Sequence, residues 1–240
     1  MSIRFHSQTP PVVLNLIIAN IVVFVATTLL ESDMVRYGLF TYDFREGAQG
    51  LWDTIINLRS SFDPTWSQAH FDLWQPFTYM FMHANFSHLF FNMFSLWMFG
   101  RTLEMEMGWK RFLTYYLVCG IGAGIVQMGV AQIDLSQMVV GSPAWQTYMQ
   151  TPTVGASGAI FGLLLAFGML HPNAIISLII PPVSLKAKWF VIIYGVLELF
   201  LGLEGTMSDV AHFAHLGGMI WGLMLLLWWR HRDRNRYIYY

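Results

Sequence analysis

The sequence predicts an all-α membrane protein, a bundle of six transmembrane helices with a short central fourth helix. Three observations carry this prediction. Hydrophobic residues make up 55% of the chain and charged residues only 11%, whereas soluble domains average about 45–50% and about 25%. The mean hydropathy is +0.49. Six apolar runs can be placed along the chain, and we expect them to form one integral membrane domain over residues 1–240.

The six predicted spans follow one another with short connections and one long outer loop. The loop covers residues 31–76, between the first two spans, and its aromatic residues favour the membrane interface. A short segment, 1–11, precedes the first span, and a basic tail, 230–240, follows the last. The spans themselves are 12–30, 77–99, 112–131, 157–170, 189–203 and 209–229.

The distribution of basic residues predicts the orientation. If the N-terminus is cytoplasmic, ten of the thirteen lysines and arginines fall on the cytoplasmic side, as the positive-inside rule requires. We therefore expect both termini in the cytoplasm. As a separate expectation, the location is a bacterial inner membrane. The ten are Arg4, Arg101, Lys110, Arg111, Lys186, Lys188, Arg230, Arg232, Arg234 and Arg236.

The fourth span is too short to cross a bilayer. Residues 157–170 rise only about 21 Å as a helix, against a hydrocarbon core about 30 Å thick. Because this span enters from outside, its first residue, Ser157, is expected below the outer surface. A helix N-terminus offers unpaired N–H groups and positive dipole charge, so a hydroxyl there is a candidate nucleophile beside an oxyanion site.

The second span carries polar side chains that are costly at membrane depth. His88 and Asn92 are four residues apart and share a helical face, whereas His83 lies about 140° round a regular helix. These residues could supply interhelical hydrogen bonds. They could also bind zinc, but the chain has no HExxH pattern and no carboxylate beside them. We expect no metal and no cofactor.

The sixth span places a histidine on a glycine face. His215, Gly218 and Gly222 are spaced i, i+3, i+7, so the histidine approaches a neighbouring helix closely. A single buried histidine is usually structural. However, counting residues from the cytoplasmic boundary places Ser157, His88 and His215 all about 20 Å above it, and this common depth favours one site.

These residues together resemble the rhomboid family of intramembrane serine proteases. The resemblance covers residues 74 to 222 directly and implies that Ser157 and His215 form a catalytic dyad. It implies that His88 and Asn92, with Gly155, form the oxyanion hole. His83, Phe161, Gly218 and Gly222 would support the site. The matching motifs are His83-xxxx-His88-xxx-Asn92, Gly155-x-Ser157-Gly158, Ala214-His215-xx-Gly218-xxx-Gly222, and Gly100-Arg-Thr-Leu-Glu104-xxx-Gly108.

Two positions depart from the family pattern. The outer loop has Trp74-Gln75 where Trp-Arg is usual, and Phe161 stands where a tyrosine usually packs on the histidine. We expect the ring contact to persist without the hydroxyl. No carboxylate is obviously placed to orient His215, so a dyad is expected, and Glu198 in the fifth span has no assigned role.

The resemblance implies an endopeptidase that cleaves in or near transmembrane segments of membrane proteins. Its partners would be such substrates and the lipid bilayer, with no nucleic acid; the oligomeric state is not predicted. A non-catalytic rhomboid-like protein that binds transmembrane helices is the alternative, although such proteins usually lack the serine or the histidine. A transporter would need paired broken helices in two repeats, which the sequence does not show.

Overall fold

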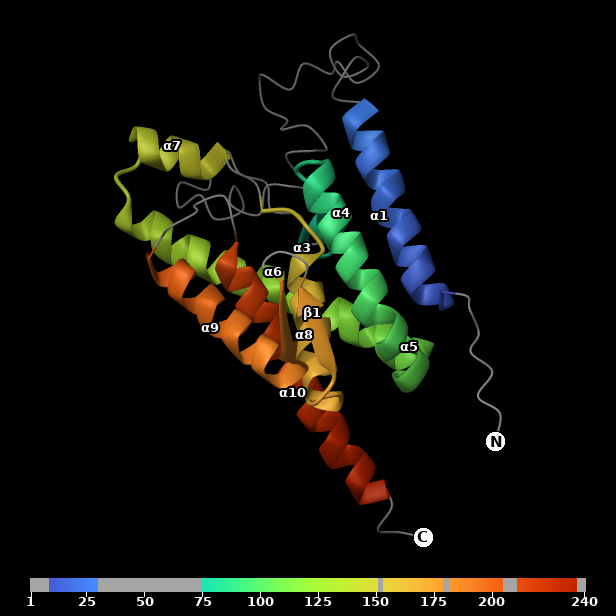
Figure 1. Ribbon diagram of the computed structural model, residues 1–240. Helices are drawn as coiled ribbons and strands as arrows, with labels where there is room; N and C mark the ends of the chain where they lie inside the picture. Colours follow the sequence, from blue (N-terminus) through green and yellow to red (C-terminus); the bar gives the residue numbers. More distant parts are fainter. Residues whose placement is uncertain (1–8, 30–74, 151–152, 179–181, 205–210, 237–240) are drawn as a thin grey trace, which may run out of the picture.

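The described part of the chain is a helical bundle (Figure 1). The computed structural model describes residues 9–29, 75–150, 153–178, 182–204 and 211–236. The predicted outer loop, residues 31–76, therefore lies almost entirely outside the described residues. The elements are α1 Pro11–Leu29, α3 Gln75–Thr78, η4 Tyr79–Phe81, α4 Phe86–Ser95, η5 Leu96–Gly100, α5 Arg101–Met107, α6 Trp109–Gln137, α7 Pro143–Gln150, α8 Ser157–Leu170, β1 Ile175–Leu178, β2 Val183–Lys186, α9 Ala187–Glu204 and α10 His212–Arg236.

The fold is a mostly helical membrane architecture. Three of the described helices are long and apolar enough to cross a bilayer: Pro11–Leu29, Trp109–Gln137 and the His212–Asp233 part of α10. The helix Ser157–Leu170 is apolar but shorter. A multi-pass protein follows from these helices, and the short fourth span begins and ends where the sequence predicts it.

The short helix α8 lies at the centre because its small residues let two neighbours approach. A Cβ atom added to Gly162 would meet both the Cys119 side chain of α6 and the carbonyl oxygen of Gly218. The Tyr115 hydroxyl donates a hydrogen bond of 2.9 Å to the Gly162 carbonyl. This small-residue face fixes α8 against α6 and α10.

The contact between α8 and α10 is a backbone-to-backbone approach. A Cβ atom placed on Gly218 would overlap the carbonyl oxygen of Gly158, and one placed on Gly222 would overlap the Tyr115 hydroxyl. Gly218 therefore cannot carry a side chain while the two helices keep this spacing, and a side chain at Gly222 would require Tyr115 of α6 to move. Consequently α10 carries its histidines directly alongside the first turn of α8.

The predicted second span, 77–99, is not one continuous helix, which corrects the sequence expectation. The chain forms α3 and η4, breaks at residues 82–85, and restarts as α4 at Phe86. Asn85 caps this restart, since its side-chain oxygen accepts a 2.8 Å hydrogen bond from the His88 backbone N–H. The helical region also extends beyond the predicted end, through η5 and α5, to Gly108, whose φ of 76° ends it.

The connection after α8 contains a β-hairpin, which an all-α prediction does not include. Strands β1 and β2 pair antiparallel, with Ile176 opposite Leu185 and Ser177 opposite Ser184. The β-branched residues of both strands favour an extended chain, and Pro172 prevents α8 from continuing. The predicted helical membrane fold is therefore confirmed, and the all-α class is wrong for this connection.

The first helix is attached through a buried carboxylate at its beginning. Glu104 of α5 is 3% exposed, and its two oxygens accept hydrogen bonds of 3.0 and 2.8 Å from the backbone N–H groups of Val12 and Val13. A negative charge at a helix N-terminus satisfies unpaired donors and complements the dipole. Glu104 thus holds the start of α1 against α5.

Replacement of Glu104 by alanine is expected to lower the free energy of unfolding by roughly 1–3 kcal/mol, because the N–H groups of Val12 and Val13 lose their acceptor. The measurement is the thermal unfolding midpoint in detergent. Glu106→Ala is the matched control: its carboxylate, 42% exposed, contacts His171 at 3.0 Å, and an exposed pair contributes about 0–1 kcal/mol. Equal shifts in the two variants would contradict the anchoring role.

Candidate active site

Ser157 is the first residue of α8, and the turn before it depends on a glycine. Gly155 has a φ of 123°, a left-handed conformation that side chains other than glycine rarely adopt. Its backbone N–H donates a 3.0 Å hydrogen bond to the Tyr79 carbonyl. The turn therefore places the half-buried Ser157 beside the N–H groups of the first helical turn, which have no carbonyl partner within the helix.

His215 of α10 lies within hydrogen-bond distance of Ser157. Its Nε2 atom is 2.8 Å from the Ser157 Oγ atom, although the two residues are 58 positions apart. The side chain of His215 is only 11% exposed. The structure thus brings together the hydroxyl and the imidazole that the sequence placed at one depth, and a base next to a hydroxyl is the arrangement that activates a serine.

Phe161 holds the imidazole plane. The Phe161 and His215 rings are stacked, with their centroids 4.1 Å apart and their planes at 6°. Phe161 is one turn after Ser157 on α8, so the same helix carries the hydroxyl and the ring that packs on its partner. The expected ring contact is present without a tyrosine hydroxyl. Its effect is to leave the edges of the imidazole, where both nitrogens lie, free to make hydrogen bonds.

His88 lies over Gly155 on the other side of the serine. A Cβ atom on Gly155 would come within 2.8 Å of the His88 Cε1 and Nε2 atoms and 3.7 Å of the Ser157 Oγ atom. The Nδ1 atom of His88 accepts a hydrogen bond of 3.4 Å from the Ala84 N–H. A neutral His88 therefore carries its proton on Nε2, the nitrogen next to Gly155, where it can donate to a developing oxyanion.

Asn92 and His83 lie behind His88. Asn92 is buried, and its Nδ2 atom donates a 2.9 Å hydrogen bond to the His88 carbonyl, which leaves one amide hydrogen. His83 precedes α4, which explains why a regular helix could not place it on the same face. Its ring meets the His88 ring edge-on at 5.0 Å. It contacts His88, and the structure gives it no bond to Ser157.

Glu198 of α9 is the residue that sequence reasoning missed. Its Oε2 atom is 2.9 Å from the His215 Nδ1 atom and 2.7 Å from the His212 Nδ1 atom. The expectation that no carboxylate stands beside His215 is therefore wrong. The depth count could have found it, since Glu198 is eleven residues above the first residue of α9, about 16 Å. Depth does not specify which way α9 is rotated, however.

The same three side chains could be considered as metal ligands. Among the described residues, Glu198, His212 and His215 offer ligand atoms within 4.8 Å of one another. Tetrahedral zinc at about 2.0–2.1 Å from each ligand separates the ligand atoms by about 3.3 Å. The observed 2.7 and 2.9 Å are shorter and match hydrogen bonds. The distances between these three side chains therefore fit hydrogen bonds better than coordination of one metal ion.

All of these residues fall within one matched domain. The family model described as Rhomboid domain matches residues 70–232, which is more than half of the chain. The chain belongs to the rhomboid family.

Rhomboid proteins of distant organisms are similar to this chain. The chain is 31% identical over 144 residues to the mitochondrial rhomboid protein 1 of Saccharomyces cerevisiae, covering 60% of this chain and 38% of that protein. It is 28% identical over 158 residues to the rhomboid protease AarA of Providencia stuartii, covering 64% and 55%. RHOMBOID-like protein 5 of Arabidopsis thaliana is 31% identical over 155 residues, covering 64% and 44%. The chain thus spans about half or less of each relative's length.

The two departures from the rhomboid pattern lie in different parts of the chain. Phe161 packs on the His215 ring, whereas Trp74 lies outside the described residues and Gln75 begins α3. Both glycines of the last rhomboid motif, Gly218 and Gly222, lie where α10 meets α8 and α6. The three motifs that carry His88, Ser157 and His215 are therefore brought together by α4, α8 and α10, while Glu198 comes from α9.

Proposed function

We propose that this rhomboid is an intramembrane serine endopeptidase, with Ser157 as nucleophile and His215 as general base. The observation that carries the proposal is the 2.8 Å contact between Ser157 Oγ and His215 Nε2 at the beginning of α8. The bacterial relative whose name includes the word protease supports it. The substrates would be membrane proteins cut in or near a transmembrane segment.

The reaction would proceed through an acyl-enzyme. The Nε2 atom of His215 takes the Ser157 proton as Oγ attacks the scissile carbonyl carbon, and the carbonyl oxygen becomes an oxyanion. Its donors would be the N–H of Ser157, the Nε2–H of His88 and the remaining amide hydrogen of Asn92, and one such donor can contribute about 10²–10³ in rate. His215 then protonates the leaving amine. Water, deprotonated by His215, hydrolyses the ester and restores Ser157.

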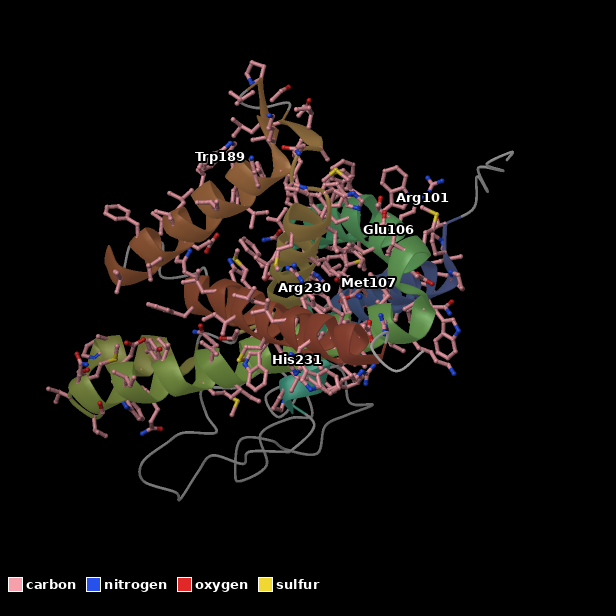
Figure 2. All side chains as sticks on the ribbon, turned by 90° about the horizontal axis from the view of Figure 1, so that it is seen from below. Arg101, Glu106, Met107, Trp189, Arg230 and His231 are labelled. Carbon is pink, nitrogen blue, oxygen red and sulfur yellow. The ribbon has the colours of Figure 1, made fainter. Side chains whose placement is uncertain are left out.

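We further propose that the termini are cytoplasmic and that the chain is one membrane domain of a bacterial inner membrane. The start of α1 and the end of α10 lie at the same end of the bundle (Figure 1). Viewed from that end, Arg101 of α5 and Arg230 of α10 lie on the visible face with Trp189 of α9 (Figure 2). Basic residues gathered at one end support a cytoplasmic assignment for it.

Cleavage after reconstitution tests the enzymatic proposal. Purified protein in liposomes is incubated with a panel of single-span membrane proteins, and fragments are identified by mass spectrometry. We expect cleavage by the native chain and none above background by Ser157→Ala. A fluorophosphonate is expected to label the native protein only at Ser157. Substrate binding without cleavage or labelling would favour the non-catalytic alternative, and cleavage by Ser157→Ala would reject the assigned nucleophile.

A further inference from the structure

The carboxylate of Glu198 is buried between two imidazoles on another helix. Glu198 is 6% exposed, and one of its oxygens faces both His212 Nδ1 and His215 Nδ1 at hydrogen-bond distance. A buried charge needs compensating hydrogen bonds, and the two ring N–H groups supply them. The rhomboid motifs in the sequence do not include this acid, and the proposed reaction does not use it.

The position of the carboxylate specifies the tautomer of His215. An ionised carboxylate only accepts hydrogen bonds, so the His215 Nδ1 atom carries a hydrogen and donates it to Glu198. The neutral ring then has a lone pair on Nε2, the atom 2.8 Å from the Ser157 hydroxyl. Only this tautomer can take the serine proton. Phe161, stacked on the ring face, leaves the two ring edges to Glu198 and Ser157.

We propose that Glu198 is a positioning residue for His215: it fixes the Nδ1–H tautomer and ring orientation, and it stabilises the imidazolium formed when Ser157 gives up its proton. This inference rests on the proposed function. The site thereby contains a serine, a histidine and a carboxylate in line, assembled from α8, α10 and α9. In serine proteases of other folds the acidic residue has this role.

His212 orients the carboxylate rather than the base. It is the first residue of α10, three before His215, and its Nδ1–H donates 2.7 Å to the same oxygen of Glu198. With two donors, the carboxylate oxygen is held at one point instead of rotating. Loss of His212 removes one of the two restraints and leaves the Glu198–His215 hydrogen bond, so its effect on the reaction is the smaller one.

The test compares kcat and KM of variants in liposomes with a single-span substrate that the native protein cleaves. Glu198→Gln keeps the side-chain volume and removes the charge. We expect kcat to fall roughly 10²–10⁴-fold, up to the loss of about 10⁴ that follows replacement of the acid in serine proteases of other folds, with KM changing less than about threefold. His212→Gln is also expected to lower kcat, but the fold-loss should be at least about ten times smaller than that of Glu198→Gln. Leu199→Ala, at a side chain of α9 that is 45% exposed, is the control and should change kcat less than about twofold.

Each outcome separates this inference from the proposed function. Retention of kcat by folded Glu198→Gln, while Ser157→Ala is inactive, would overturn the positioning role and leave the enzyme assignment intact. Cleavage by Ser157→Ala would overturn the enzyme assignment itself. A rise in KM at unchanged kcat would make Glu198 a binding residue instead. Thermal unfolding midpoints verify folding, and loss of native activity in EDTA with recovery in Zn²⁺ would reassign the cluster to a metal and overturn the inference.

Discussion

Replacing His215 with alanine is expected to lower kcat by a factor of about 10⁶, the loss that follows removal of the histidine in a serine protease of another fold. The imidazole contacts Ser157 Oγ directly, so without it no described side chain in hydrogen-bond contact with the serine can take its proton. The residual rate would come from the oxyanion donors and substrate binding. The measurement is single-turnover cleavage of a reconstituted single-span substrate, together with the rate of fluorophosphonate labelling.

The control for this loss is a histidine elsewhere on the same helix. His231 is exposed on α10, sixteen residues beyond His215, and His231→Ala should retain the native kcat. Because Ser157 and His215 act as one unit, the double variant should be no slower than either single variant. If the two losses multiply, the residues work in separate steps and the proposed proton transfer is wrong.

Replacing Gly218 with alanine is expected to give the largest loss of stability, about 3 kcal/mol or more in the free energy of unfolding, at the upper end for overpacked sites. The added Cβ would overlap the Gly158 carbonyl oxygen and lie 2.7 Å from its carbon. Both are backbone atoms of α8, so no rotamer change relieves the contact, and α10 must move away. We expect a lower thermal unfolding midpoint in detergent and loss of fluorophosphonate labelling.

Gly129 of α6 provides the matched control for this substitution. A Cβ at Gly129 would meet nothing within 4 Å, and alanine favours a helix over glycine by about 1 kcal/mol. Gly129→Ala is therefore expected to leave the midpoint unchanged or raise it. An unfolding midpoint of Gly218→Ala equal to that of the native protein would show that α8 and α10 can separate without cost, contrary to the packing described here.

The sequence predicts helices well where composition and end signals agree. The short helix 157–170 is located correctly because Ser157 begins it and His171-Pro172 ends it. The break before α4 was missed because residues 77–99 are apolar on both sides of it, although Asn85 is a typical capping residue. The β-hairpin was missed because a short run of apolar residues suits a strand and a helix equally.

The candidate site could be predicted only as far as depth and spacing specify it. Counting residues along each span places Ser157, His88 and His215 at one level, and the structure brings Ser157 into contact with His215 and His88 close to Gly155. Such a count of residues does not tell how a helix is rotated about its own axis. Glu198 faces His215 because packing rotates α9 that way, and a single sequence gives no measure of that rotation.

The buried thiol of Cys119 makes the chain convenient for site-directed labelling. Cys119 is the only cysteine of the sequence, is fully buried, and lies where α6 meets Gly162 of α8 and Gly222 of α10. A maleimide or spin label added to the folded protein would therefore react with an introduced cysteine, such as one at the exposed position Val196 of α9, and not with the native thiol. Conversely, modification of Cys119 itself would report that these three helices have come apart.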